Sequence, residues 1–168
     1  MDEALLKAKG WTRETNIRRD ARGNWFENEV LVEHPGVKKA FDSWVAKAPD
    51  GRYCLENKIH WVYVELEGPP VFVRHLKVED SGIQLMLSNG LNETLDAITL
   101  RQSSEGILYC DVSNRQLVAQ FDSNAMMEMM DVIGSDEQGL FVRVGSEAVR
   151  PPVVAEALNH EVDSDGGQ

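Results

Sequence analysis

Four histidines are the side chains that could act as acids or bases near neutral pH: His34, His60, His75 and His160. They lie far apart in the sequence without the spacing of metal ligands, so we expect no metal site. The chain has no glycine-rich phosphate loop, G-x-S-x-G nucleophile motif, H-E-x-x-H zinc motif or C-x-x-C pair. We therefore expect a binding module rather than an enzyme, and no cofactor.

An enzyme of an unrecognised type is the alternative, with His60 or His34 as general base. Such a base needs an orienting partner and a group that stabilises the electrophile, and the sequence identifies neither. Glu65 and Glu67 stand two residues apart on a predicted strand and so point the same way. Beside a solvated corner, we interpret these two acids as surface charges.

His60 and Trp61 stand side by side at the start of a predicted strand from Ile59 to Leu66, which a Gly-Pro-Pro corner follows. Side chains alternate along a strand, so His60 shares a face with aliphatic neighbours such as Val62. A buried polar group is costly unless it is paired. Two interpretations stay open: a histidine at the core edge bonded to backbone, or a polar group at the mouth of a cleft.

The two cysteines, Cys54 and Cys110, each lie in an aromatic and apolar strand. We expect two reduced, buried thiols of a cytoplasmic protein, with a disulfide between neighbouring strands as the alternative. The N-terminus lacks the apolar region of a secretory signal. No apolar run approaches the ~18 residues that a membrane span needs.

The chain is acidic, with 28 acidic against 17 basic residues among 168 and a net charge of −11. Binding to a phosphate backbone needs clustered cations, so we expect no nucleic-acid partner. An anionic membrane surface is excluded for the same reason.

The apolar pattern predicts mostly strands with two main helices, after a short helix within residues 1–10. One helix follows His34, opens with Pro35 and carries an apolar stripe through residues 37–48. The second runs from Ser123 to Ile133 with a stripe that is rich in methionine. Tight turns are predicted at Asn28-Glu29 and at Ser113-Asn114, and a further strand at residues 97–100.

The order of hairpin, helix, glycine and aromatic strand occurs twice. Gly51 of "GRYCL" matches Gly139 of "GLFVR" at an offset of 139 − 51 = 88, and Phe41 then falls on Met129. We expect an α+β fold made of a duplicated unit of antiparallel hairpins plus one helix. The expected divisions are an N-terminal extension at 1–10, halves at 11–70 and 71–150, and an acidic C-terminal tail at 151–168.

The order of these motifs resembles the bacterial family called domain of unknown function 1285, from about Arg13 to Arg150. The family's Arg-Asp-Gly-x-Trp turn is matched by "RDARGNW", with Arg19, Asp20 and Trp25, and a helical phenylalanine follows sixteen residues later as Phe41. Further matches are a run at residues 55–62, the corner "EGPP", the element "LSN" and, weakly, "SNRQLV". The chain departs from the family at His60, where the family has a glutamate, and at His34, where it has an arginine.

The resemblance implies a duplicated α+β fold whose second half is loosely pleckstrin-homology-like, with a candidate site in a cleft between the halves. It also implies a nucleotide-like ligand and a role in signalling. The candidate ligand-binding residues are Trp25, His34, His60, Trp61, Asn89 and Arg115. A tryptophan could stack on a base, and Arg115 could contact a phosphate. The alternative is a protein-interaction module that uses a sheet edge or the C-terminal tail.

Overall fold

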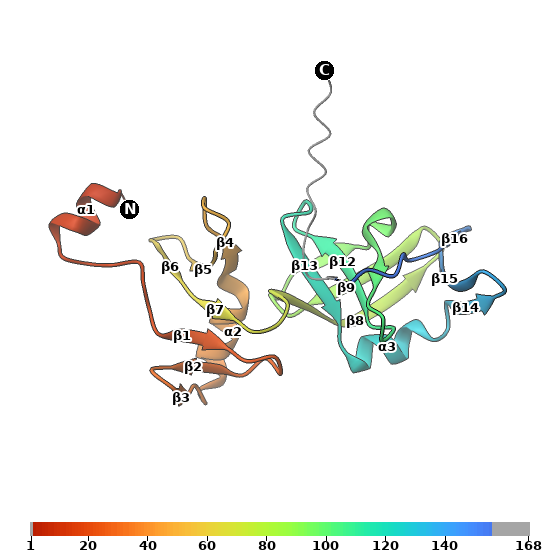
Figure 1. Ribbon diagram of the computed structural model, residues 1–168, viewed down its shortest axis with the longest axis horizontal. Helices are drawn as coiled ribbons and strands as arrows, with labels where there is room; N and C mark the ends of the chain where they lie inside the picture. The colour runs from red at the N-terminus through yellow and green to blue at the C-terminus, as the bar shows by residue number, and fades with distance from the viewer. Residues whose placement is uncertain (1, 156–168) are drawn as a thin grey trace, which may run out of the picture.

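The computed structural model describes residues 2–155, and its strands divide into two parts that lie side by side (Figure 1). The first part contains all strands up to β7 and the second part all strands from β8 onward. A short helix, α1 (Glu3–Ala8), precedes the first part and confirms the helix predicted within residues 1–10. The predicted tail beyond residue 155 lies outside the described residues.

The first part holds two small sheets and one helix. Strands β1 (Ile17–Arg19), β2 (Trp25–Glu27), β3 (Val30–Leu31) and β7 (Glu65–Leu66) form a sheet in the order β3-β2-β1-β7. Helix α2 (Pro35–Trp44) follows, and β4 (Val45–Lys47), β5 (Tyr53–Glu56) and β6 (Trp61–Tyr63) form the second sheet. Strands β1 and β7 pair in parallel, whereas the sequence analysis predicted only antiparallel hairpins.

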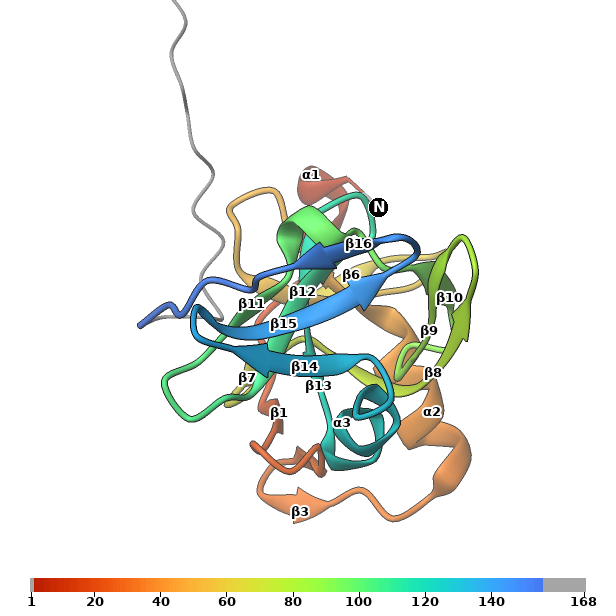
Figure 2. The same cartoon turned by 90° about the vertical axis from the view of Figure 1, so that its right-hand side faces the viewer.

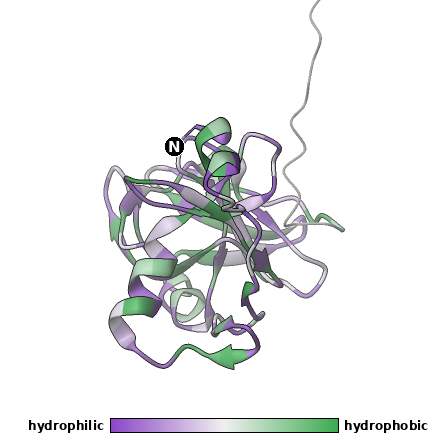
Figure 3. Ribbon diagram, turned by 90° about the vertical axis from the view of Figure 1, so that its left-hand side faces the viewer, coloured by the Kyte–Doolittle hydropathy of each residue, from purple (hydrophilic) through white to green (hydrophobic). Residues whose placement is uncertain are grey.

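Turn chemistry fixes the β2–β3 hairpin. Asn28 and Glu29 both have positive φ, at 49° and 62°, as the central residues of a two-residue hairpin turn require. Strand β3 is an edge strand, and its two apolar residues are exposed. Figure 3 shows β3 as the green, hydrophobic arrow at the bottom. The predicted turn at Asn28-Glu29 is therefore confirmed.

The second part is built on a six-stranded sheet in the order β10-β9-β8-β13-β12-β11. Its strands are β8 (Val71–Glu79), β9 (Gly82–Leu87), β10 (Asn92–Thr94), β11 (Arg101–Gln102), β12 (Leu108–Val112) and β13 (Leu117–Phe121). A 3-10 helix, η1 (Ala97–Thr99), occupies most of the segment predicted as a strand at 97–100. Helix α3 (Ser123–Met129) leads to a three-stranded sheet of β14 (Ile133–Asp136), β15 (Gly139–Val144) and β16 (Glu147–Val149). Figure 2 shows this last sheet in front of the larger one.

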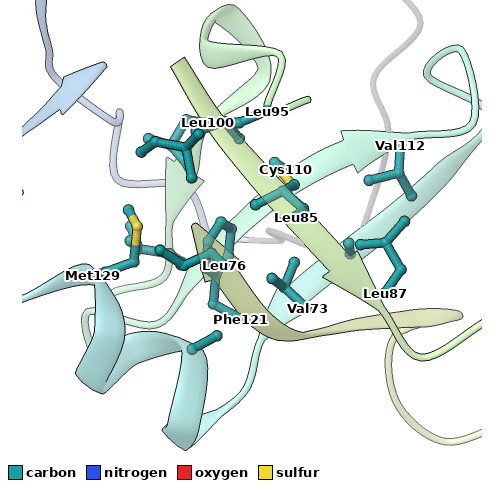
Figure 4. Close-up of a cluster of buried hydrophobic side chains, with 14 of the residues drawn as sticks. Val73, Leu76, Leu85, Leu87, Leu95, Leu100, Cys110, Val112, Phe121 and Met129 are labelled. Carbon is teal, nitrogen blue, oxygen red and sulfur yellow. The ribbon is translucent and has the colours of Figure 1, made fainter. Parts of the chain in front are cut away.

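One large apolar cluster fills the second part (Figure 4), where Cys110, Phe121 and Met129 are almost completely buried. A smaller cluster around Trp25, Val45 and Leu55 fills the first part. Tyr53 packs against both clusters and therefore joins the two parts.

Both cysteines are free and buried, as predicted. Burial raises the pKa of Cys54 to about 11 and raises that of Cys110 as well, since the interior disfavours the thiolate. Both thiols are therefore protonated at neutral pH.

Both main helices are shorter than predicted. Helix α2 ends at Trp44, because Val45 pairs with Leu55 as the first residue of β4. Helix α3 ends at Met129, and Ile133 opens β14 opposite Val142. The apolar stripe does not reveal these ends, since the strand that follows each helix buries its apolar residues in the same cluster.

The two parts repeat one order of elements, which is a hairpin, a helix and a three-stranded antiparallel sheet. Gly51 precedes β5 with φ 87°, and Gly139 opens β15 with φ 108°, at equivalent places after the helix. The α+β class is confirmed. The repeat supports our proposal that residues 11–70 and 71–150 are related halves, and the pleckstrin-homology-like character of the second half stays a prediction.

A short arm, Pro151–Ala155, covers one edge of the six-stranded sheet. The N–H of Gln102 in β11 donates to the carbonyl of Pro152 at 2.9 Å, and the N–H of Val154 donates back to Gln102 at 2.9 Å. Val153 and Gln102 thereby form an isolated parallel β-bridge. The next residue, Val154, packs against Tyr109 and Val118. The arm occupies the hydrogen-bonding side of β11 that none of the strands described in residues 2–155 pairs with.

Candidate ligand site

Arg19 ties the two parts together at their junction. The side chain starts from β1 and is 1% exposed. Its Nη2 donates to the carbonyl of Pro69, in a short contact, and to that of Pro70 at 3.1 Å, both in the segment that connects the parts. The guanidinium also lies 5.3 Å from the ring centre of Phe72, the second residue of β8. Arg19 thus holds the connection in one conformation.

Asp42 of α2 completes this junction. Its Oδ1 accepts from Arg19 Nη1 at 3.2 Å and from Trp25 Nε1 at 2.9 Å. Burial lowers the pKa of Arg19, while the charge and hydrogen bond of Asp42 raise it. Trp25 is completely buried, so neither face of its indole is open to a ligand. The predicted role of Trp25 as a stacking platform is therefore corrected to that of a core residue that orients Asp42.

A cleft of about 460 Å³ lies between α2 and the turn that follows β9. We call it the α2 cleft. Both parts of the chain line it, and its residues are Gly36, Lys39, Ala40, Asp42, Ser43, Arg74, Leu87, Ser88, Asn89 and Gly90.

Asn89 is the most buried polar side chain of the α2 cleft, at 9% exposed. Its Oδ1 accepts the N–H of Leu91 at 3.0 Å, which fixes the amide and leaves the NH₂ group as a donor. Beside it, Ser88 Oγ accepts the N–H of Phe72 at 2.9 Å, so the hydroxyl proton can donate to another group. This wall of the cleft therefore offers hydrogen-bond donors.

Two cations complete the cleft, Lys39 and Arg74. Arg74 is the extra residue of a bulge, because Val73 pairs with Leu87 while His75 pairs with Met86. Its Nη1 lies 3.2 Å from Asp122, which orients the guanidinium. Lys39 is exposed and makes no ion pair within residues 2–155. The lining thus favours a ligand that is anionic and rich in acceptors.

A second cleft, of about 490 Å³, lies on the outer face of the β4–β5–β6 sheet near the β12–β13 turn. Trp61 and Cys54 line it together with Gln116 of that turn. The Arg13 guanidinium covers one face of the Trp61 ring at 3.8 Å from the centroid, and Tyr63 meets it edge-on at 5.0 Å. Trp61 therefore keeps only part of its indole for a ligand, in a different cleft from Asn89.

The other predicted site residues are dispersed. His34 caps α2, and its Nδ1 accepts the N–H of Gly36 at 3.1 Å. Gly36 lines the α2 cleft, but His34 does not. His60 lies in an exposed turn before β6, where its N–H donates to Asn57 Oδ1 at 3.0 Å. It lines neither cleft, because the strand predicted from Ile59 begins only at Trp61. Arg115, on the β12–β13 turn, pairs with Asp96 at 2.9 Å.

Of the predicted site residues, the structure thus places Asn89 in the α2 cleft, and it adds three lining residues that sequence reasoning missed: Lys39, Asp42 and Arg74. In the sequence, Lys39 and Asp42 lie on the polar face of the predicted helix, opposite its apolar stripe, which is the pattern of a solvated face. Arg74 falls in a predicted strand, and the alternation of apolar residues there does not reveal the bulge that the structure contains. Within residues 2–155 no group of three or more His, Cys, Asp or Glu could hold a metal ion.

The fold and the cleft define an α+β protein of two parts with an open site between them. Two solved structures share this fold. A DUF1285 family protein from Silicibacter pomeroyi DSS-3 matches with a TM-score of 0.63 and 15% identity, over 80% of this chain and 78% of that chain. A DUF1285 family protein from Shewanella baltica OS155 matches with a TM-score of 0.56 and 16% identity, over 71% and 94%.

The chain therefore has the fold of DUF1285 family proteins, as the sequence resemblance predicted. No family model matches the sequence, and no curated protein matches it. At 15% and 16% identity the likeness concerns the fold alone. None of the helices described in residues 2–155 has the length and apolarity to cross a bilayer.

Proposed function

We propose that the chain is a binding module that takes a small, nucleotide-like anion in the α2 cleft. The observation that carries this proposal is the lining, in which Lys39, Arg74 and the fixed amide of Asn89 converge from both parts. The volume of about 460 Å³ lies within the range of roughly 300–1,000 Å³ that is usual for small-molecule sites.

The ligand's phosphate lies between Lys39 and Arg74, where charge-assisted hydrogen bonds are strongest. The NH₂ group of Asn89 and the hydroxyl of Ser88 then donate to acceptors on the sugar or base. Because the two walls belong to different parts of the chain, a bound ligand favours one placement of the parts over others. That coupling supports a sensory or signalling role.

Catalysis is less well supported than binding. Asp42 is the carboxylate among the residues that line the α2 cleft, and Arg19 and Trp25 already occupy its Oδ1. His34 uses Nδ1 to cap α2 and does not line the cleft. A general base needs a lone pair directed at the substrate and an orienting partner. Asp42 has orienting partners but serves the buried Arg19 and Trp25, and His34 has no orienting acceptor within residues 2–155.

The test is a thermal-shift screen of the full chain against adenosine and guanosine phosphates, with inorganic phosphate alone as a separate arm. A ligand that binds only the native state raises the midpoint. Lys39→Gln should weaken the best ligand at least ~10-fold, the equivalent of about 1.4 kcal/mol. Lys38→Gln, at the preceding residue of α2 and outside the cleft lining, is the matched control and should leave affinity unchanged.

The proposal would be overturned if none of these compounds raised the unfolding midpoint. It would also be overturned if the Lys39 and Lys38 variants lost the same amount of ligand affinity. A shift with inorganic phosphate as large as that with nucleotides would reduce the ligand class to simple oxyanions.

A protein-interaction module is the second candidate. The edge strand β3 favours it, because Val30 and Leu31 are exposed beside unpaired backbone groups. The C-terminal tail, the other predicted contact, is described only at residues 151–155, which pair with β11.

A further inference from the structure

Helix α3 presents methionine on two opposite sides. Met129 and Ala125 are fully buried and dock the helix on the large cluster. Met127 and Met130 point outward, at 74% and 66% exposed. In Figure 2, α3 lies at the front of the molecule below β14, and no described element lies in front of it. Core packing therefore accounts for Met129 and leaves the outer pair without a structural role.

Strand β8 of the six-stranded sheet lies next to α3, and polar side chains join the two. His75 of β8 contacts α3, with Nδ1 3.1 Å from Glu128 Oε1 and 2.8 Å from Asn124 Nδ2. The register partner of His75 is Met86 of β9, whose side chain is exposed. We call Met86, Met127 and Met130, with the acids Glu128 and Asp131, the methionine surface.

Glu128 of the methionine surface is held in its carboxylate form by hydrogen bonds. Hydrogen bonds from His75 and from the Leu76 N–H lower the pKa of Glu128. Asp131 is exposed and makes no ion pair within the described part of the chain.

The half of the chain that carries the methionine surface also has a negative net charge. Residues 71–150 carry 12 acidic and 6 basic residues, whereas residues 11–70 carry 10 acidic and 9 basic. The exposed methionines thus lie in the more acidic part of the molecule, where a basic partner is attracted and an acidic one repelled.

We propose that the methionine surface binds the apolar face of a basic amphipathic helix from a partner protein. Methionine side chains are unbranched and flexible, so they fit the varied side chains of a helical partner. The acidic rim pairs with the lysines and arginines that flank such an apolar face. A second copy of this chain would bring two acidic rims together, and an anionic bilayer would meet the same repulsion. This inference does not depend on the function proposed for the α2 cleft.

The test uses the full chain labelled with methyl-¹³C methionine, which gives signals from six methionines. The probe is a synthetic amphipathic helix of leucine and lysine, and its control keeps the leucine pattern with glutamate in place of lysine. The lysine peptide should shift the Met127 and Met130 signals and leave buried Met129 nearly unchanged. Added salt should weaken binding, because the rim contacts are exposed ion pairs.

The double variant Met127→Glu and Met130→Glu should lose at least ~10-fold in affinity for the lysine peptide, which corresponds to about 1.4 kcal/mol. Ile98→Glu is the matched control, since Ile98 is 80% exposed on η1 and lies outside the methionine surface. If the glutamates disturb folding, Met127→Ser with Met130→Ser replaces them, and thermal unfolding checks each variant.

Three results would overturn the inference. One is equal binding of the lysine and glutamate peptides. Another is an equal loss in the Ile98 control. The third is a concentration-dependent dimer, or binding to anionic vesicles, that the double substitution abolishes, since the methionine surface would then serve a different occupant.

Discussion

Arg19 shows what a buried charge contributes at the scale of one residue. Removing a guanidinium from water is costly, and the cost is offset only when every strong hydrogen-bonding group finds a partner. Here Asp42 supplies the opposite charge, while Pro69 and Pro70 supply carbonyls. The Trp25 ring lies 5.2 Å from the guanidinium. Because Pro69 and Pro70 connect the two parts, Arg19 acts as a conformational restraint as well as a packing element.

The first prediction is that Arg19→Met destabilises the protein by about 3–5 kcal/mol, since it leaves Asp42 without its cation. Urea unfolding at neutral pH measures the change. Arg22→Met is the control, because Arg22 is exposed on the nearby turn and makes no ion pair within residues 2–155. A loss under about 1 kcal/mol for Arg19→Met would show that the junction does not depend on this ion pair.

The second prediction concerns pH and Glu128. Its pKa is lowered in the folded state by His75, and then by the Leu76 N–H, so its contribution to stability is present above the unfolded pKa of roughly 4.3. That contribution disappears as pH falls through the lower folded pKa. Glu128→Gln should therefore be less stable than wild type above about pH 5, and the difference should shrink below about pH 4.

Unfolding midpoints in urea across this pH range test the prediction, with Glu137→Gln as the control. Glu137 is exposed on the β14–β15 turn, without a hydrogen bond or ion pair in the described residues. A difference between Glu128→Gln and wild type that is the same at every pH would show that the ionised carboxylate is not what matters.

Single residues of the site were only partly predictable. Asn89 was predicted through the "LSN" match and does line the cleft. Trp25 was predicted as a ligand contact, and the structure buries it against Asp42, 17 positions later in the chain. Residue type alone cannot distinguish a tryptophan that stacks on a ligand from one that orients a carboxylate in the core.

Element ends are decided by pairing partners at long range. The stripe from Val37 to Ala48 has helical spacing throughout, yet the chain leaves the helix at Val45 because β5 is available to pair with it. Turns were easier, since Asn28-Glu29 carries its own conformational preference. The parallel pairs β1–β7 and β8–β13 had no signal in the pattern, because alternation shows that a strand exists and not which strand it joins.

The third prediction tests a contact between β14 and β15. Gly134 faces Phe141 across the pair, and a Cβ on Gly134 would lie 2.4 Å from the Phe141 ring. Gly134→Ala should therefore destabilise the protein by about 1–3 kcal/mol through overpacking. In a Phe141→Leu background the same substitution should cost much less, and a double-mutant cycle in chemical denaturation measures the coupling. Equal costs in both backgrounds would rule out the steric explanation.

At the scale of the whole molecule, the α+β class and the resemblance to one family could be predicted from the order of motifs. The α2 cleft could not, because Lys39 and Arg74 line one cleft only when the two parts are placed side by side. The absence of a nucleic-acid partner and the cytoplasmic location stay predictions from composition. The prediction that nucleic acid does not bind can be tested most directly at residues 71–150, because this half carries the larger excess of acidic residues.

The arm Pro151–Ala155 has a consequence for how copies of this protein behave at high concentration. By bonding to Gln102, it stops the six-stranded sheet from growing at β11. Removing it would leave the N–H and C=O of Gln102 unpaired at this edge, and unpaired edge groups of this kind recruit strands from other molecules.

Our fourth prediction is that a chain ending at Arg150 forms larger species as concentration rises, measured by size-exclusion chromatography with light scattering. A chain ending at Ala155 keeps the arm and should match the full chain. Val154→Pro, which removes the N–H that donates to Gln102, should lie between the two. Equal behaviour of both truncated chains would mean that the arm has no part in keeping the molecules apart. Residues 151–155 would thus determine how far the protein self-associates in concentrated solution.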